Sequence, residues 1–424
     1  MEGPVSSFPT REGDTSVVDF IRGEGEDKIG EIIARHRRDA LYDDPQCAGF
    51  LENCDCFMDD HPKSKQGPDD AEKKACEKLL TTDCKLPSGT VFESDSFKYI
   101  CQAVKEKSEP SMMHLLGDLI VPQADIAIRR MNGFGSDQLK DSMCEAWKRS
   151  IPLDDQSARL PYRNAQRLPS MGFTLPLPQP DHTVGFSSSV LVEDQEEKLI
   201  RYLSRMDDED QVPRDERSHV SVLKNMWFPF LTAEVKCQAL DMKKAERQNA
   251  HNMAVSMRGI VELFRRVDPQ KPKELDRQVL GFSISQNREK VHIHAHYPVV
   301  DGSTDPNNDE QLLVTYHAYR IRNIKWTNDA TKWRPYKFVM AVYKDWMPGH
   351  LKRLQSAIDA LTDASEIERI IPRPPGGWGT DTSPVDDPEV PDVDFEMLKE
   401  RQDDHQRDLL DKGLSKTPSG SDVP

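Results

Sequence analysis

The apolar segment 228–237 carries a carboxylate and an ammonium two residues apart, at Glu234 and Lys236. Because side chains on a β-strand alternate between its two faces, both groups are expected to share one face. The carboxylate can hold a hard divalent cation, and the lysine can stabilise an attacking water and the developing negative charge. Asp181 supplies a second carboxylate at the entrance of the preceding predicted strand. The sequence therefore predicts a site for phosphate chemistry.

This pattern resembles the PD-(D/E)xK nuclease-like superfamily, whose members carry an Asp, and then Glu or Asp, any residue and Lys, on neighbouring strands. The resemblance implies a restriction-endonuclease-like fold, with Asp181 and Glu234 as ligands of Mg²⁺ or Mn²⁺ and Lys236 as the catalytic lysine. Members often add a Glu from the first helix and a polar residue from the helix after the motif. Glu145 and Gln248 are the candidates here, Glu145 as a further metal ligand.

The chain also resembles an uncharacterised fungal protein family that carries such a domain. This wider resemblance covers roughly the C-terminal half of the chain before the tail, and it runs through residues 178–186, 228–237, 247–251, 281–286, 296–298 and 346–351. It implies a metal-dependent nuclease that hydrolyses the phosphodiester bonds of DNA or RNA.

A different interpretation stays open, because Glu-x-Lys is a common tripeptide that usually forms a surface ion pair worth about 0–1 kcal/mol. A fold also does not fix a function. The alternative is a catalytically inactive nuclease-fold module that binds an unknown partner. On a helical wheel, Gln248 lies opposite the apolar face of its helix, whereas Glu246 and Asn249 lie closer to that face.

A third interpretation concerns His292, His294 and His296, which alternate with apolar residues and so share one strand face. That face would suit a transition metal, whereas the plainer explanation is a polar strand face. Cys54 and Cys56, with His61 and Cys47, could also suggest zinc, but no Cys-x-x-Cys pair is present, so buried or reactive single thiols are expected.

The helices and strands that must position these residues can be predicted from the spacing of apolar residues and from the residues that break regular structure. A helix is expected over 242–267, where apolar residues recur at spacings of three and four. Strands are expected within 181–192, 228–237, 279–285, 290–300 and 312–324, with a charged insertion at 193–217. Residues 115–127 could form a strand or a buried helix end, and Ser136 could cap a helix to about Arg149. Two further helices are expected near 333–346 and 350–361.

This order predicts an α/β (α+β) protein with one mixed β-sheet flanked by helices. The expected regions are a disordered start at 1–30, a helical or irregular N-terminal region at 31–110, the nuclease-like domain at 111–361, and an acidic disordered tail at 362–424. In the helix near 333–346, Lys332, Arg334 and Lys337 stand beside aromatic residues and could contact nucleic acid.

The net charge of −16 argues against a nucleic-acid binder when it is taken alone. Residues 161–360, however, carry 29 Lys and Arg against 26 Asp and Glu, whereas residues 361–424 carry 7 against 16. The central segment can therefore contact phosphates. No apolar run of about 20 residues and no secretory signal is visible, so we expect an intracellular protein, nuclear or cytoplasmic, without a membrane partner.

Overall fold

The computed structural model describes residues 41–44, 46–130, 137–153, 175–206, 213–237, 242–305 and 308–362. The chain divides into two units, Met1–Ile370 and Ile371–Pro424, and every described residue belongs to the first. The expected disordered segments 1–30 and 362–424 lie outside the described residues, apart from residue 362.

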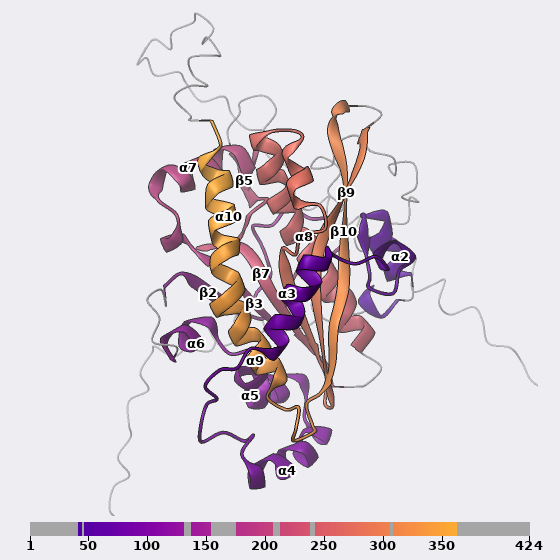
Figure 1. Ribbon diagram of the computed structural model, residues 1–424, viewed down its shortest axis with the longest axis vertical. Coiled ribbons are helices and arrows are strands. Elements are labelled where there is room, and N and C mark those ends of the chain that lie inside the picture. The colour runs from indigo at the N-terminus through magenta and orange to yellow at the C-terminus, as the bar shows by residue number, and fades with distance from the viewer. Residues whose placement is uncertain are drawn as a thin grey trace, which may run out of the picture. The chain divides into compact units, whose positions relative to one another are not determined.

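A single mixed sheet organises the described part of the chain (Figure 1). Its strand order is β1-β10-β9-β8-β7-β3-β2, with a short β6 beside β7. The strands span Cys56–Phe57 (β1), Leu139–Met143 (β2), His182–Ser187 (β3), Ser221–Leu223 (β6), Met226–Val235 (β7), Gly281–Gln286 (β8), Lys290–Asp305 (β9) and Asn308–Lys325 (β10). Strands β7 and β8 are parallel because helix α8 connects them, and the β8–β9–β10 run is antiparallel. The expected mixed α+β fold with helices around a mixed sheet is confirmed.

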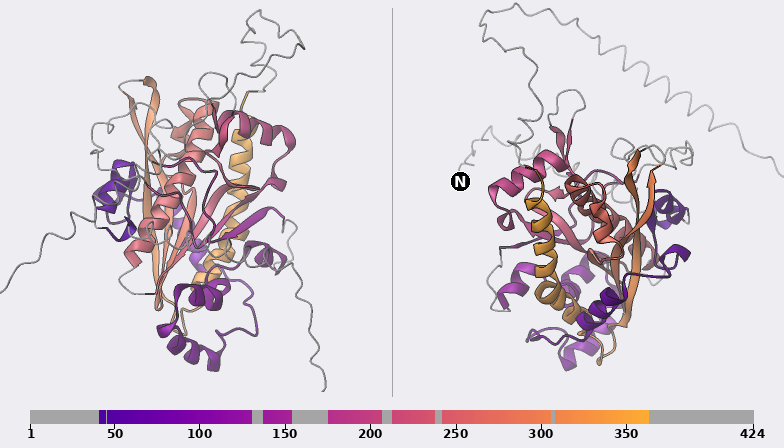
Figure 2. Two further views of the ribbon diagram at one scale, coloured as in Figure 1. Left: turned by 180° about the vertical axis from the view of Figure 1, so that it is seen from behind. Right: turned by 45° about the horizontal axis from the view of Figure 1, so that its top comes forward.

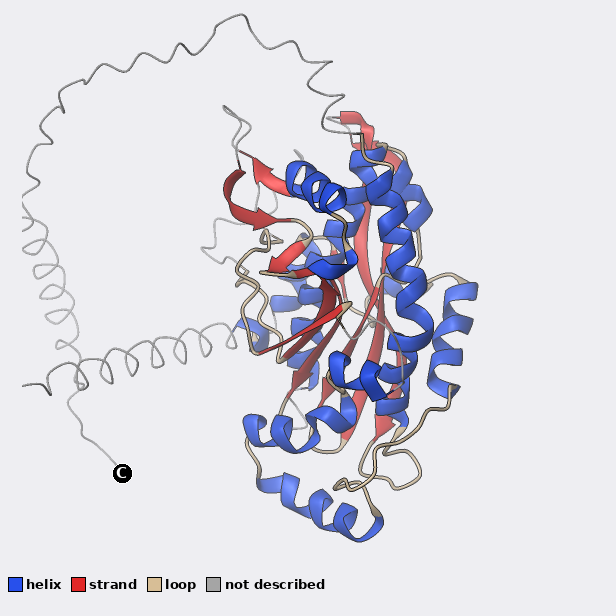
Figure 3. Ribbon diagram, turned by 90° about the vertical axis from the view of Figure 1, so that its left-hand side faces the viewer, coloured by secondary structure: helices blue, strands red, loops and turns tan. Residues whose placement is uncertain are grey.

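The two faces of the sheet differ in chemistry and in cover. One face carries apolar side chains and packs against the C-terminal helices, where Phe282 contacts Phe338 and Trp346 at ring distances of 5.4 and 4.9 Å. The other face carries polar side chains such as Thr232 and Ser285, which contact helix α8. Figure 2 (left) shows the ribbon from this side. Helices therefore cover both sides of the sheet (Figure 3).

The helices follow the expected order at the C-terminal end. Helix α8 occupies Met242–Val267, as the spacing of its apolar residues predicts. Helix α9 (Arg334–Ala341) continues through a π-helical turn (Val342–Trp346) into α10 (Met347–Asp359). The other helices and helical turns are α2 (Cys47–Asn53), η1 (Pro62–Ser64), α3 (Asp70–Thr81), α4 (Ser94–Ala103), η2 (Val104–Glu106), α5 (Glu109–Ile120), α6 (Ala124–Arg130), η3 (Ser188–Val190), α7 (Glu193–Leu203) and η4 (Lys271–Leu275).

Two local expectations were wrong. Residues 137–149 form strand β2, which pairs with β3, and a turn, not a helix. Within β2, the Asp141 side chain contacts two other elements. Its Oδ2 accepts a hydrogen bond from Ala124 N at the start of α6, and its Oδ1 lies 2.7 Å from Nε2 of His182 on β3. The segment 193–217 is also more than a charged insertion, since it contains α7 and a separate strand pair, β4 (Ser204–Met206) and β5 (Pro213–Ser218).

The N-terminal region contributes to the same sheet. Strand β1 pairs in parallel with β10, where Cys56 faces Tyr316. Among the described residues, no helix has the length and the apolar character needed to span a membrane.

Candidate functional site

Asp181, Glu234 and Lys236 meet where β3 and β7 run side by side. His182 pairs with Ala233 in the antiparallel register, so continuing that register by one residue places Asp181 opposite Glu234. Asp181 Oδ2 accepts a hydrogen bond from Val235 N at 2.8 Å, which joins the two strands at this point. Nζ of Lys236 lies 3.2 Å from Glu234 Oε2 and 3.9 Å from Asp181 Oδ2. Both carboxylates therefore reach the same ammonium.

All three residues are only 2% exposed. Burial raises the pKa of Glu234 to about 8; Lys236 opposes this rise, and the neighbouring Asp181 carboxylate adds to it. Two carboxylates thus lie beside the Lys236 ammonium, and a further positive charge near Glu234 would favour its ionised form.

Helix α8 supplies polar side chains to three adjacent strands, from positions three residues apart. Asn252 Nδ2 donates to Glu234 Oε1 at 3.2 Å. Asn249 Oδ1 accepts from Thr232 on β7, and its Nδ2 donates to Ser285 Oγ on β8 at 3.0 Å. Glu246 Oε1 lies 2.7 Å from His292 Nδ1 on β9. Since i, i+3 positions share one helix face, the sequence pattern Glu-x-x-Asn-x-x-Asn builds this contact line.

These strand residues also form one row of the sheet. Glu234 pairs with Ser285, and Ser285 pairs with His292. Residues in one row point to the same face, so the candidate nuclease residues and the histidines share a single buried polar surface.

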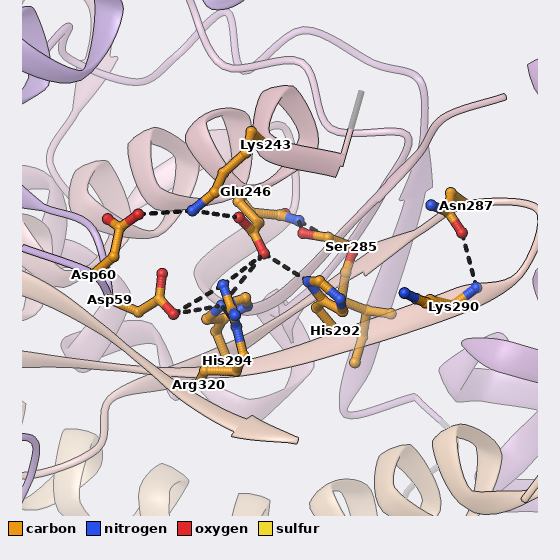
Figure 4. Close-up of polar contacts among 12 residues, drawn as sticks. Asp59, Asp60, Lys243, Glu246, Ser285, Asn287, Lys290, His292, His294 and Arg320 are labelled. Atoms are coloured by element: carbon orange, nitrogen blue, oxygen red, sulfur yellow. Dashed lines mark hydrogen bonds and ion pairs between the residues drawn. The ribbon is translucent and has the colours of Figure 1, made fainter. Parts of the chain in front are cut away.

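At the β9–β10 side of that surface, the buried Glu246 and the partly buried Asp59 share one arginine (Figure 4). Arg320 Nη2 lies 2.9 Å from Asp59 Oδ2 and 3.0 Å from Glu246 Oε1. His294 Nε2 lies 3.9 Å from each of the same two oxygens. Burial opposes ionisation of both acids, but the hydrogen bond and charge of His294 and the charge of Arg320 lower the pKa of Asp59 to about 2. The hydrogen bond with His292, together with the charges of His294 and Arg320, holds the pKa of Glu246 below its usual value.

Two predicted site residues do not contact these carboxylates in the structure as described. Glu145 lies exposed in the turn after β2, and its Oε2 accepts from Ser142 Oγ at 2.8 Å. The sequence predicted that Glu145 lies on a helix, and this prediction was wrong. Gln248 is buried, but the hydrogen bond to Glu234 comes from Asn252, one turn further along α8.

The described residues contain no preformed cluster of metal ligands that would support either metal interpretation. Within the described ranges, no group of three or more His, Cys, Asp and Glu side chains is placed to hold a metal ion. His296 hydrogen-bonds to Ser283 at 2.8 Å, whereas His292 and His294 both lie near Glu246, so the three alternating histidines do not share one partner. The eight cysteines are free thiols, and burial raises the pKa of Cys47 to about 11.

Asn252, Asp59 and Arg320 were missed by sequence reasoning, whereas Glu246 and Asn249 were already placed nearer the apolar face of their helix than Gln248. The spacing of Glu246, Asn249 and Asn252 on one helix face was available, but only the structure shows that this face meets polar strand residues. Asp59 and Arg320 lie 261 positions apart and carry no signal that links them.

The comparisons with known proteins give one match. The family described as "Domain of unknown function (DUF7924)" matches residues 96–358, which is more than half of the chain. No curated protein and no solved structure matches the chain.

Proposed function

The chain belongs to the DUF7924 family, and from the geometry of its own site we propose that it is a metal-dependent nuclease of the PD-(D/E)xK type. The observation that carries this proposal is the convergence of Asp181, Glu234 and Lys236 from neighbouring strands β3 and β7. The substrate is the phosphodiester backbone of DNA or RNA.

The donor set fits Mg²⁺ or Mn²⁺. Mg²⁺ is usually bound through one or two carboxylates, with water and substrate phosphate completing its coordination, so Asp181 and Glu234 suffice as protein ligands. The raised pKa of Glu234 fits a cation as well, because burial beside a second carboxylate disfavours its charge. Bound there, the metal would polarise the phosphoryl group and lower the pKa of an attacking water.

Lys236 would take a second role once a metal neutralises the carboxylates. Its ammonium now lies against Glu234 and Asp181. With those charges offset, it is available to a phosphate oxygen, where a fixed positive charge stabilises the charge that develops during hydrolysis. Asn252 would keep Glu234 oriented through its hydrogen bond.

A noncatalytic nuclease-fold binding module is the second candidate, and the burial of the site favours it. Asp181, Glu234 and Lys236 form an internal ion-pair group that is 2% exposed at each residue. Charged side chains that are paired and so little exposed are more typical of a structural group than of a site that admits a substrate.

Hydrolysis of labelled single-stranded DNA, duplex DNA and RNA, with Mg²⁺, with Mn²⁺ and with chelator, tests the proposal. Lys236→Ala should retain metal binding and lose about a hundredfold or more of the hydrolysis rate, the scale for losing one charge-stabilising donor. Glu234→Gln should lose metal binding as well.

Lys224→Ala is the matched control, because Lys224 is exposed in the turn before β7 and should leave the rate unchanged. Calorimetric titration of the wild type with Mg²⁺ and Mn²⁺ decides between the candidates. If neither metal binds at millimolar concentration, the nuclease proposal fails and the binding module remains.

A further inference from the structure

One end of the sheet presents a row of basic residues beside the candidate site. Val235, Gln286, Val291 and Ile324 form one row across β7, β8, β9 and β10. The next positions outward are Lys236, Asn287, Lys290 and Lys325, since Lys236 N donates to Gln286 O and Asn287 N donates to Lys290 O. Three strand spacings of ~4.8 Å give roughly 14 Å from the Lys236 backbone to that of Lys325.

Lys290 and Lys325 form a direct cross-strand pair of like charge, and both are exposed. Like charges directly opposite each other destabilise a sheet. No ion pair to either lysine is recorded among the described residues, unlike the paired Arg320 and Arg322 on the same strand. A bound anion would reduce this repulsion.

Two more cations lie at the same end. Arg288 follows Asn287 in the β8–β9 turn, and its Nη2 donates to Lys107 O at 2.7 Å. Cys237 Sγ also lies 3.3 Å from Lys107 O, so the exposed Lys107 stands next to the residue that follows Lys236. Glu289, within the same turn, offsets one of these charges. We call Lys107, Arg288, Lys290 and Lys325 the basic edge.

A small cavity lies beside Trp333, the one aromatic residue among the described residues that line it, which also include Asp329. It has a volume of about 260 Å³ between the end of α3 and the start of α9, and its lining includes Thr81, Thr82, Trp333, Arg334 and Lys337. This volume is below the ~300–1,000 Å³ of ordinary ligand pockets, so the cavity has room only for a small group such as one ring. Phe92 and Tyr336 hold the Trp333 ring by edge contacts at 5.0 and 5.7 Å.

A chain of contacts joins the cavity to the end of the sheet. Trp326 follows Lys325, and its Nε1 donates to Asn287 O at 2.9 Å. Trp326 stacks on Phe92 at 6.0 Å, and Phe92 contacts Trp333. The contacts of Trp326, Phe92 and Trp333 therefore connect the cavity to the row that contains Lys236, Lys290 and Lys325.

We propose that the basic edge binds the phosphates of a single-stranded nucleic acid and that the cavity at Trp333 receives one of its unpaired bases. Positive grooves that follow a backbone, combined with aromatic side chains on which bases stack, recognise single strands without base pairing. Arg334, exposed at the cavity, adds a phosphate contact. This inference rests on the proposed nuclease function, and it specifies the substrate as a single strand.

Fluorescence anisotropy of a labelled single-stranded oligonucleotide on the full chain, with chelator present, tests binding separately from hydrolysis. The double variant Lys290→Ala, Lys325→Ala should bind at least tenfold more weakly at low salt. Its logarithmic salt dependence should fall by about 0.7 for each lost phosphate contact. Trp333→Ala should weaken single-strand binding about tenfold and leave that salt dependence unchanged.

Lys65→Ala is the matched control, because Lys65 is exposed beside η1, whose Ser64 packs at His317 and not at the end of β10. Equal loss of affinity in this control would overturn the proposal, as would wild-type affinity in both the double variant and Trp333→Ala. Tighter binding of a duplex than of its single strand would overturn it too. If the wild type hydrolyses nucleic acid but the variants bind it normally, the proposed role of the basic edge is refuted and the proposed nuclease function is retained. If the variants show the expected loss of binding but the wild type hydrolyses nothing, the proposed role of the basic edge is supported and the proposed nuclease function is refuted.

Discussion

Glu246 and His292 are joined at 2.7 Å across the interface between α8 and β9, two strands away from Glu234 in the same row of the sheet. The candidate nuclease residues are thus one end of a buried polar surface whose other end is held by Arg320. The energetic role of Arg320 can be measured directly.

Replacing Arg320 by Met should destabilise the fold by on the order of 3 kcal/mol, because it leaves the largely buried carboxylates of Asp59 and Glu246 without their shared cation. Arg322→Met is the control. Arg322 pairs with Glu77 at the surface, and such a pair contributes about 0–1 kcal/mol. Urea unfolding of both variants measures the difference, and equal effects would show that the Arg320 group contributes no more than a surface ion pair.

His350 should make stability fall in acid. Burial, together with the charge of Arg353, lowers the pKa of His350 to about 3, below the ~6.5 of an unfolded chain. The neutral form is therefore favoured in the fold, so its contribution is complete above pH 6.5 and is lost as the pH falls toward 3. The loss amounts to about 1.4 kcal/mol per pH unit within that window.

His350→Phe should weaken this pH dependence, because the variant lacks the one proton that His350 binds on unfolding in acid. The ring stacks on Trp346 at 4.5 Å, and neither ring nitrogen has a hydrogen-bond partner among the described residues, so a phenyl ring fits the same contacts. Unfolding free energies at pH 7 and pH 5 give the measurement. His114→Phe, at an exposed position, should leave the slope as it is. An unchanged slope in His350→Phe would contradict the prediction.

Gly259→Ala should destabilise the protein although alanine favours helices. A Cβ at Gly259 would meet the His219 carbonyl group, and backbone cannot move aside easily. We expect a loss of about 1–3 kcal/mol or more. Gly117→Ala in α5 meets nothing within 4 Å and should gain up to about 1 kcal/mol. Thermal unfolding compares the two, and a stabilised Gly259→Ala would show that α8 is not in close contact there.

Removing residues 363–424 should raise the affinity for nucleic acid at low salt. Residues 361–424 carry 16 acidic against 7 basic side chains, and this charge opposes the approach of phosphates. Anisotropy titrations of the full chain and the shortened chain at 50 and 300 mM salt provide the test. The gain should vanish at the higher salt. Equal affinities at both salt concentrations would exclude an electrostatic role for the tail.

The fold was largely predictable where local patterns are strong. The spacing of Met253, Met257 and Val261 defined α8, and the alternation around His292 defined β9. Strand β2 was not predictable from periodicity, because its contacts are with segments distant in the sequence: it pairs with β3, and Asp141 contacts the start of α6 and His182. Such contacts are tertiary and leave no periodic signal.

The candidate site was predictable in part. Asp181, Glu234 and Lys236 are brought together, since two short strand motifs carry all three. Glu145 was assigned from a helix that does not exist, and Gln248 from a helix position one turn away from Asn252. Helix register relative to the sheet depends on packing, which a single sequence does not encode locally.

The contacts from α8 to three strands also have a consequence for motion. A helix held by Glu246, Asn249 and Asn252 at once cannot rotate or slide at one end without breaking bonds at the others. Its middle turns and the central strands should therefore open together, as one cooperative unit. In hydrogen exchange, amides around Asn249 should exchange only through openings nearly as costly as global unfolding. Amides at the edge strand β2 should exchange far sooner.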